Sequence, residues 1–376
     1  MTNHRLYDGA SNKSCDTGRT RKIFDDFIDF FGKLGGGKNC KERDPDWFID
    51  KSRIIEIQSI GSGGQGEVFK CRLDDQLVAV KKLHKKAEIH AKYLRKLDHP
   101  NIVAFKGVYL TWECQCLVME YCHQGSLDLI IQKRRISPTL MVDWLRQVAS
   151  GMNYLHQCGI IHGDLKSPNV LMDSNNVLKI SDFGNSRLWK DRSKEALEGT
   201  VAWMAPEVLG NKLESVGYGM DVWSFGVVVW EILAREVPYK DIDSMTVAYK
   251  VAFDTLHLPQ PSSFPASLKQ LLNRCLEREV RKRSSFVNIL ETLLTVEEEL
   301  RGYSSTKFHK LQDMWKEEVS LLLSHMKYVP KYSIFISSNE EISQVQEEYE
   351  KMEESEEDRE MVSSVKRLPT YAFLSI

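Results

Sequence analysis

The apolar positions change their spacing about a third of the way along the chain. Between residues 46 and 122 they fall in short runs, most of which alternate apolar and polar residues as β-strands do. Those runs are Ile54–Ile60, Glu67–Leu73, Leu77–Lys82, Ile102–Leu110 and Gln115–Glu120. One helical pattern, between Lys85 and Leu97, interrupts the series.

Long helical patterns dominate from residue 123 to about 300. Apolar residues recur there at intervals of three and four, for example in Pro138–Gln157 and in Met220–Ala234. A small β-rich part followed by a larger α-rich part predicts an α+β fold of two lobes, residues 46–122 and 123–300, with a cleft between them.

The first segment of the chain, residues 1–45, is rich in Asn, Ser, Gly, Lys and Asp, which predicts a flexible N-terminal arm. Within the arm, Ile23–Phe31 carries apolar residues at helical spacing. This stretch is either a short docking helix or an apolar patch in a flexible segment, and the spacing alone leaves both open.

Two further segments follow the α-rich lobe. Residues 301–330 predict an amphipathic helix. Its apolar face contains Phe308, Leu311, Trp315, Val319 and Leu322. This helix either packs back against the α-rich lobe, which we favour, or joins two copies in a homodimer. Residues 331–376 include a strongly acidic stretch and predict a tail that is disordered or forms a short coiled coil.

Composition narrows the function without naming it. The 376 residues include 51 Lys and Arg against 53 Asp and Glu, so a basic face over the whole molecule for nucleic acid is not expected. The longest apolar run, Phe225–Leu233, contains Glu231 and is far too short to span a membrane.

The eight cysteines include no C-x-x-C pair; Cys114 and Cys116 lack the second pair of a zinc site. Reduced thiols in a cytoplasmic protein are therefore expected.

The glycine-rich segment Ile60–Val68 fits the pattern G-x-G-x-x-G-x-V. Such glycines also occur in dinucleotide-binding turns, but there a helix should follow, whereas here Val68 and Phe69 continue as a strand. A strand, a glycine loop and a second strand form a lid over phosphate groups, because missing side chains let backbone N–H groups approach the oxygens. The glycines alone would also fit a plain hairpin loop, but the flanking strands favour the phosphate lid.

Val78–Lys82, with the sequence VAVKK, places a small residue and a lysine on one strand face. Strand alternation puts Ala79 and Lys81 on one side and Val78 and Val80 on the other. A purine and its phosphates need a small residue and an ammonium group at this spacing. Lys82 then faces away from the nucleotide and is expected at the surface.

The strongest signal is the segment His162–Asn169, HGDLKSPN, followed by Asp182-Phe183-Gly184. Its parts are those that phosphoryl transfer uses. Asp164 would orient the substrate hydroxyl, and Lys166 would steady the γ-phosphate. Asn169 and Asp182 would hold Mg²⁺ through oxygen atoms.

Taken together, these motifs and the later Ala205-Pro206-Glu207 and Asp221 resemble a eukaryotic protein kinase from about Trp47 to Leu300. The segments VAVKK, LRKLDHPNIV and IIHGDLKSPN resemble the dual leucine zipper and mixed-lineage MAP kinase kinase kinases within the tyrosine-kinase-like group. The resemblance implies a bilobal kinase fold, ATP and Mg²⁺ as cofactors, and Ser/Thr phosphorylation of a MAP kinase kinase.

The resemblance also assigns site residues. Catalytic residues are Asp164, Lys166 and Lys81, with Met119 as gatekeeper and Glu120–Cys122 as the hinge. Residues expected at the nucleotide are Ile60, Gly61, Ser62, Gly63, Gly64, Gln65, Gly66, Glu67, Val68, Ala79, Lys81, Met119, Glu120, Cys122 and Leu171. Glu207 is expected to pair with Arg283 as a buried structural bridge. Asp221 is expected to hold the backbone of the catalytic loop.

Two features favour Ser and Thr over Tyr as substrate. Lys166 lies two residues after Asp164, where tyrosine kinases usually carry Ala or Arg. The hydroxyl of Thr200, before the APE motif, can bond Asp164 and Lys166.

Three positions depart from the kinase pattern. Gly163 replaces the Arg that normally clamps a phosphorylated activation loop. The loop 185–200 is poor in hydroxyl groups, and Glu195 and Glu198 lie where related kinases often carry phosphorylatable residues, so we expect little need for loop phosphorylation. His90 stands where the partner Glu of Lys81 is expected, and Glu88 is the candidate substitute.

Two classes of function remain. An active Ser/Thr kinase, which we favour, needs the four groups of Lys81, Asp164, Asn169 and Asp182, and all are present. The alternative is a pseudokinase scaffold that assembles MAP kinase components, which only Gly163 and His90 favour.

Overall fold

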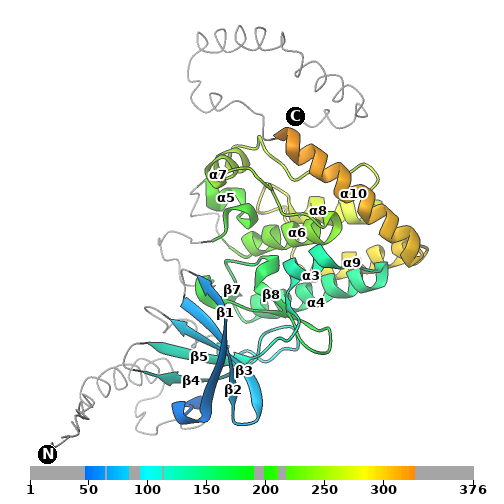
Figure 1. Ribbon diagram of the computed structural model, residues 1–376. Helices are drawn as coiled ribbons and strands as arrows, with labels where there is room; N and C mark the ends of the chain where they lie inside the picture. The colour runs from blue at the N-terminus through cyan, green and yellow to red at the C-terminus, as the bar shows by residue number, and fades with distance from the viewer. Residues whose placement is uncertain are drawn as a thin grey trace, which may run out of the picture. The chain divides into compact units, whose positions relative to one another are not determined.

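The computed structural model describes residues 47–63, 66–83, 94–111, 114–189, 199–210 and 217–326. The chain divides into two compact units between His123 and Gln124 (Figure 1). The predicted helix between Lys85 and Leu97, the N-terminal arm and the acidic tail lie wholly or largely outside the described residues.

The first unit contains a five-stranded antiparallel sheet of order β1-β2-β3-β5-β4. Its strands are β1 (Ile54–Gly63), β2 (Gly66–Leu73), β3 (Gln76–Leu83), β4 (Phe105–Leu110) and β5 (Gln115–Glu120). A short 3₁₀ turn, η2 (Lys51–Arg53), precedes β1, with the Asp50 carboxylate accepting the amide N–H of Ser52. The strand runs expected from apolar alternation are confirmed, with boundaries that differ by at most three residues.

One face of this sheet carries the apolar core of the first unit. The buried core residues are Cys71, Val78, Val80, Tyr109, Cys116 and Val118. Val78 and Val80 alternate along β3 with Ala79 and Lys81, which therefore lie on the opposite face. The predicted separation of Val78 and Val80 from Ala79 and Lys81 on the two faces of β3 is confirmed.

The second unit is mainly helical (Figure 1). Its helices are α3 (Leu127–Lys133), α4 (Pro138–Gln157), α5 (Pro206–Leu209), α6 (Tyr218–Ala234), α7 (Ser244–Ala252), α8 (Ala266–Cys275), α9 (Phe286–Leu300) and α10 (Ser305–Met326). Helix α4 begins after Ser137, whose hydroxyl accepts the amide N–H of Leu140, and with Pro138 in its first turn, as its sequence favours.

Short strands and 3₁₀ turns of the second unit carry the predicted catalytic segments. Strands β6 (Gly125–Ser126), β8 (Val170–Met172) and β9 (Leu178–Ile180) form one sheet, and β7 (Ile160–Ile161) pairs with β10 (Arg187–Leu188). The 3₁₀ turns are η3 (Ser167–Asn169), η4 (Phe183–Asn185) and η5 (Val201–Trp203).

Helix α6 forms the centre of the second unit, since every residue from Met220 to Ala234 is buried. A helix that is apolar on all sides belongs inside a protein core or a membrane. Here α8 and α4 pack around it. Within the described part of the chain, no helix combines the length and the apolar character that a membrane span requires.

Helix α10 packs against the second unit, as we favoured from the sequence. Its buried residues are Phe308, Gln312, Trp315, Val319 and Leu323. The Trp315 ring meets Phe264 edge to face at 5.0 Å between centroids, and its indole N–H donates to the Ser263 hydroxyl at 3.0 Å. The predicted apolar face was partly wrong, because Gln312 and Leu323 are buried where Leu311 and Leu322 were expected.

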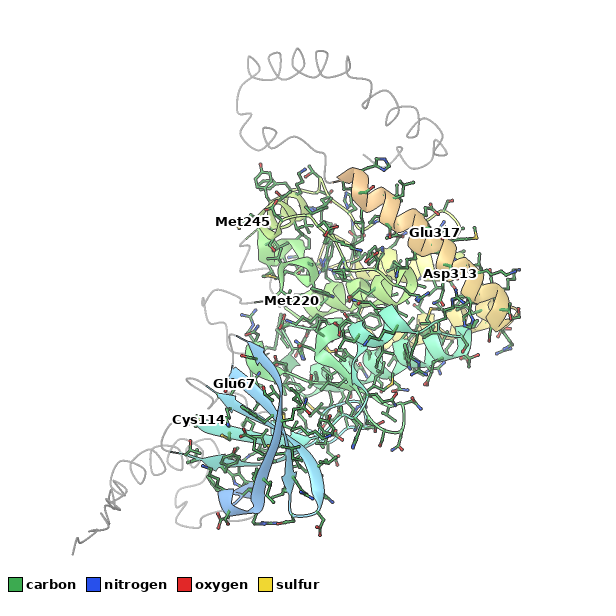
Figure 2. The ribbon with its side chains drawn as sticks, viewed as in Figure 1. Glu67, Cys114, Met220, Met245, Asp313 and Glu317 are labelled. Carbon is green, nitrogen blue, oxygen red and sulfur yellow. The ribbon has the colours of Figure 1, made fainter. Side chains whose placement is uncertain are left out.

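Polar contacts fasten the same helix to loops around it. The Asp313 carboxylate (residue labelled in Figure 2) pairs with Arg135 at 2.7 Å and with Arg235 at 3.2 Å. The Gln312 side-chain oxygen accepts the amide N–H of Ile136 at 3.4 Å. These contacts join α10 to the segment after α3 and to the end of α6.

Candidate active site

The glycine-rich segment forms the β1–β2 hairpin of the first unit. Gly61 pairs with Val68 and Ser62 with Glu67, while Gly64 and Gln65 lie outside the described residues. The chain therefore enters a strand after the glycines, as predicted, and not a helix. Gly66 has φ +138°, and a Cβ there would lie 2.0 Å from the Lys82 carbonyl oxygen, so the close approach of β3 requires glycine.

Strand β3 carries the predicted lysine next to that hairpin. Lys81 lies opposite Val68 of β2 and Leu117 of β5 and is only 7% exposed. Ala79 lies opposite Met119, the predicted gatekeeper, so the small residue and the gatekeeper share one part of the sheet. Glu88 and His90, the candidate partners of Lys81, lie outside the described residues.

Lys82 lies on the other face of β3 but is not the plain surface residue we expected. Its ammonium group is 2.8 Å from the Glu56 carboxylate and 3.8 Å from the centroid of the Phe69 ring. The side chain therefore contacts β1 and β2 on the same face of β3 as Val78 and Val80, at the edge of the apolar core.

The predicted hinge begins at the end of β5. The Glu120 carboxylate accepts the amide N–H of Ala104 at 2.7 Å, and the Glu120 amide N–H donates to the Ala104 carbonyl at 2.9 Å. The Glu120 side chain is thus used to hold the chain before β4. The backbone that the resemblance assigns to adenine recognition is fixed at this point, and Cys122 just beyond it is buried.

Three predicted residues of the second unit lie together: Asp164 and Lys166 of the catalytic loop, residues 162–169, and Thr200. The Lys166 ammonium group donates to Asp164 Oδ2 at 2.9 Å and to the Thr200 hydroxyl at 2.5 Å. The Thr200 amide N–H donates to Asp164 Oδ1 at 3.2 Å. An acidic group, a cation and a hydroxyl that are 36 or fewer residues apart in sequence therefore form one cluster.

Asn169 and Asp182, the predicted metal ligands, are linked through the backbone. The Asn169 side-chain NH₂ donates to the Asp164 carbonyl at 2.9 Å, which leaves its Oδ1 as the oxygen for a metal. Ser181, which precedes Asp182, donates its amide N–H and its hydroxyl to the Asn169 carbonyl, each at 2.8 Å.

This donor set fits a metal that is bound mostly by phosphates and water. Within the described ranges there is no group of three or more His, Cys, Asp or Glu side chains that could hold a metal ion. One amide and one carboxylate suit a hard divalent cation that arrives with a nucleotide, since Mg²⁺ keeps several waters and phosphate oxygens.

Asp221 of α6 binds the backbone of the catalytic loop, as predicted. Its Oδ1 accepts the Gly163 amide N–H at 2.9 Å, and its Oδ2 accepts the His162 amide N–H at 2.8 Å and contacts His156 Nε2 at 2.9 Å. Burial by itself would raise the pKa of Asp221, but the hydrogen bond and charge of His156, the charge of His162 and the Gly163 amide together lower it. Asp221 therefore stays an ionised acceptor.

Gly163, the departure from the kinase pattern, fits its backbone conformation. It has φ +80°, and a Cβ there would lie 2.7 Å from the Asn185 carbonyl oxygen. A larger residue would need a left-handed conformation and a shift of the turn after Asp182. Glycine at position 163 therefore fits this backbone conformation without strain.

Glu231 is a buried residue of the site that our sequence reasoning missed. Its Oε1 accepts the Ser167 hydroxyl at 2.6 Å, and its Oε2 accepts the Trp203 indole N–H at 2.8 Å. Burial raises the pKa of Glu231 to about 8, although the hydrogen bonds from Ser167 and Trp203 act in the opposite sense. The available signal was an acid within the apolar run Phe225–Leu233, which we used only to exclude a membrane span.

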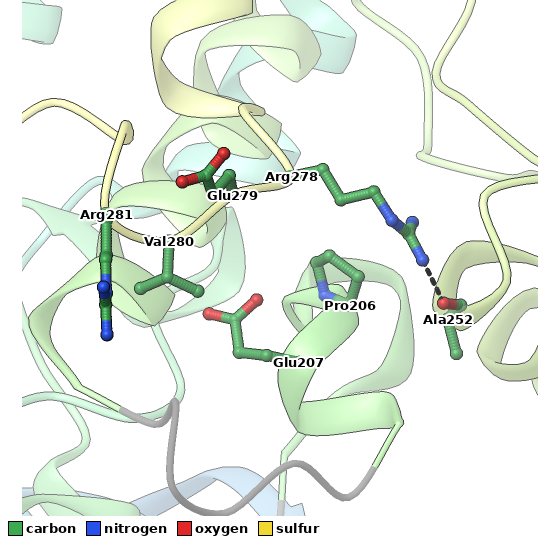
Figure 3. Close-up of a pocket in the computed structure, with 7 residues that line it drawn as sticks. All are labelled: Pro206, Glu207, Ala252, Arg278, Glu279, Val280 and Arg281. Atoms are coloured by element: carbon green, nitrogen blue, oxygen red, sulfur yellow. Dashed lines mark hydrogen bonds between the residues drawn. The ribbon is translucent and has the colours of Figure 1, made fainter.

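Glu207 and Arg283 form the predicted structural bridge. Two parallel hydrogen bonds of 2.8 and 3.1 Å join the guanidinium group to the carboxylate, and both side chains are buried. A pocket of about 300 Å³ lies beside this bridge (Figure 3). Its lining residues are Pro206, Glu207, Ala252, Arg278, Glu279, Val280 and Arg281. None belongs to the catalytic cluster, so this pocket is not the predicted phosphoryl-transfer site.

Comparison with known proteins identifies the family. The family described as "Protein kinase domain" matches residues 54–294, which is more than half of the chain. The chain belongs to the protein kinase family.

Curated relatives agree with the predicted resemblance to the dual leucine zipper group, which is confirmed. This kinase chain is 45% identical over 298 residues to "Mitogen-activated protein kinase kinase kinase 12" of Rattus norvegicus, covering 79% of this chain and 33% of the relative. It is 46% identical over 275 residues to "Mitogen-activated protein kinase kinase kinase 13" of Homo sapiens, covering 73% and 28%.

A third relative is more distant. "Mitogen-activated protein kinase kinase kinase dlk-1" of Caenorhabditis briggsae is 39% identical over 301 residues, covering 78% of this chain and 35% of the relative. The matched region is thus about a third of the length of each of these relatives.

Proposed function

We propose that this chain is a serine/threonine protein kinase that transfers the γ-phosphoryl group of MgATP to a protein hydroxyl. The cluster of Asp164, Lys166 and Thr200 is the observation that carries the proposal. Each of its side chains has a partner that sets its position before any substrate binds, which is what catalysis by positioning requires.

In the second unit, Asp164 would orient the attacking hydroxyl and receive its proton, because a carboxylate accepts hydrogen bonds. Lys166 would balance the charge on the transferred group. Asn169 Oδ1 and the Asp182 carboxylate would bind Mg²⁺, which draws charge from the phosphates.

In the first unit, the β1–β2 hairpin would supply backbone N–H groups to the phosphates, and Lys81 would pair with them. Ala79, Met119 and the backbone of Glu120–Cys122 would receive adenine. Gly64, Gln65 and the remaining residues predicted at the nucleotide stay predictions.

The substrate class rests on two independent supports. Thr200 occupies the hydroxyl position that favours Ser and Thr substrates, and its oxygen lies 2.5 Å from the Lys166 ammonium group. The relatives are named as MAP kinase kinase kinases. We therefore propose a MAP kinase kinase as the substrate, in a MAP kinase cascade. A cytoplasmic location and a homodimer remain predictions.

Phosphorylation of a MAP kinase kinase by the purified full chain tests this function. We expect incorporation on Ser or Thr that requires MgATP and stops with a chelator. Asp164→Asn is the matched blank and should lower the rate about 10²-fold or more, because it removes the proton acceptor and keeps the shape. Equal incorporation by both proteins would contradict the proposal and leave the scaffold alternative.

A further inference from the structure

Two thiols lie side by side at the start of β5. Cys114, labelled in Figure 2, directly precedes this strand, and Cys116 is its second residue. Both are free cysteines, and their sulfur atoms are 3.6 Å apart. Residues two apart along an extended chain point to the same side, which explains why the sulfurs meet.

The two thiols differ in their access to solvent. Cys116 is fully buried in the core of the first unit, whereas Cys114 is partly exposed at the edge of that core. Cys114 also forms a turn with Thr111: its amide N–H donates to the Thr111 hydroxyl at 3.0 Å, and that oxygen is 3.2 Å from the Cys114 sulfur. A small oxidant therefore reaches Cys114 first, with Cys116 next to it.

The surroundings of Cys116 suit a second thiol that reacts only with its neighbour. Burial and Cys114 raise the pKa of the Cys116 thiol to about 12, while the hydrogen bond to Tyr109 and the charge of Lys82 act in the opposite sense. Cys116 thus stays protonated at rest. When it loses its proton, the Tyr109 hydroxyl and the ammonium group of Lys82 are in place to stabilise the thiolate.

We propose that Cys114 and Cys116 form an oxidation site, at which hydrogen peroxide converts the two thiols into a disulfide. Bond formation brings the sulfurs to about 2.0 Å. Cys114 can make this movement because it lies outside the paired residues of β5. A metal centre fits less well, since the described residues contain no cluster of three or more His, Cys, Asp or Glu side chains.

The reaction balances with one molecule of peroxide. The Cys114 thiolate attacks one peroxide oxygen, the O–O bond breaks, and the leaving hydroxide takes the thiol proton and becomes water. Cys114 is then a sulfenic acid. The Cys116 sulfur attacks the Cys114 sulfur, the S–S bond forms, the S–O bond breaks, and a second water leaves with the Cys116 proton. The thiols are oxidised by two electrons, and peroxide is reduced to two waters.

Peptide mapping of the folded full chain tests the bond directly. The protein is treated with hydrogen peroxide, its remaining thiols are blocked with N-ethylmaleimide in denaturant, and it is cut after glutamate. Cleavage after Glu113 and Glu120 releases the peptide 114–120, which contains these two cysteines and no other. We expect this peptide to lose two hydrogens and both maleimide labels, and to regain both thiols with dithiothreitol.

Two variants separate the steps of the reaction. Cys116→Ser removes the second thiol, so dimedone, which labels sulfenic acids, should label Cys114. In the wild type this label should be weak, because Cys116 consumes the sulfenic acid. In Cys114→Ser, the buried Cys116 should keep its maleimide label. If Cys116→Ser does not fold, the wild-type map and Cys114→Ser still decide the question.

Two other cysteines are controls within the same sample, on tryptic peptides. Cys158 is exposed and reports oxidation that depends on access alone, and Cys275 is fully buried and reports unfolding. Both should keep their maleimide labels at the peroxide concentration that oxidises the pair.

The other outcomes overturn the proposal. They are a peptide 114–120 that keeps both labels while Cys158 loses its own, a bond from Cys114 to a cysteine other than Cys116, or a sulfinic acid at Cys114 in place of the disulfide. Equal loss of label at Cys275 would show that unfolding exposes the thiols, and overturns it too. Because phosphoryl transfer is not part of the readout, the result is independent of the proposed kinase function.

Discussion

Helices α6 and α10 bury polar side chains in opposite surroundings, α6 within the apolar core of the second unit and α10 along its outside. On α6, Asp221 and Glu231 accept from the catalytic loop and the segment before α5. On α10, Gln312 and Asp313 contact the segment after α3 and the end of α6. The buried acids of the central helix thus hold the catalytic loop and the segment before α5, while the outer helix contributes packing and surface ion pairs.

The largest effect is expected on α6, where loss of a buried acid should abolish activity. Asp221→Ala should remove phosphoryl transfer and lower the free energy of unfolding by about 3–5 kcal/mol, because two backbone N–H groups and His156 lose a buried acceptor. Urea unfolding and a kinase assay measure both. Asp221→Asn, which keeps one acceptor oxygen, should fall between. Normal activity in folded Asp221→Ala would contradict this difference between α6 and α10.

Trp315→Ala tests α10 in the same way. Trp315 is fully buried between Phe264 and Phe308 and bonds Ser263, so its loss should cost about 3 kcal/mol of unfolding free energy. Because its contacts do not run to Asp164 or Lys166, kcat measured well below the unfolding temperature should stay near wild type. A selective loss of kcat at full folding would show that α10 also controls the chemistry.

The pH dependence of stability sharpens the contrast for Glu231. Its folded pKa of about 8 lies above the ordinary value of 4.5, so its contribution is fully present below pH 4.5 and is lost as pH rises through 8. Glu231→Gln does not titrate. Its stability relative to wild type should therefore increase between pH 5 and pH 8, by at most about 1.4 kcal/mol per pH unit. Chemical unfolding at several pH values measures this; parallel curves would contradict it.

The smallest effect is expected at the surface of α10. Asp313→Ala should lower the free energy of unfolding by about 1 kcal/mol or less, because the Asp313 carboxylate is 37% exposed and pairs with two arginines. The loss should shrink in high salt. Glu317→Ala, an exposed position of the same helix labelled in Figure 2, is the matched control and should have almost no effect. Equal losses of unfolding free energy in both variants would show that the ion pairs of Asp313 do not stabilise the protein.

Local patterns were enough to predict most of the elements and the catalytic cluster. Strands β2, β3 and β5 follow from alternation within eight residues or fewer, and Asp164 and Lys166 follow from a motif in one short loop. The predicted apolar face of α10 was partly wrong because a helical wheel ranks side chains by hydropathy. It could not foresee that Gln312 would be buried with its oxygen on the Ile136 amide.

The sequence by itself determined the family and the fold class and predicted the residues for phosphoryl transfer, because the motifs that carry them are runs of neighbouring positions along the chain. Only the tertiary structure decided what Glu231 and Gly163 do. Glu231 acts between Ser167, 64 residues before it, and Trp203, 28 residues before it. Gly163 is required by a carbonyl oxygen from the turn at Asn185. Hydrogen bonds and steric contacts of this kind depend on distances in space, and no local periodicity in a sequence encodes them.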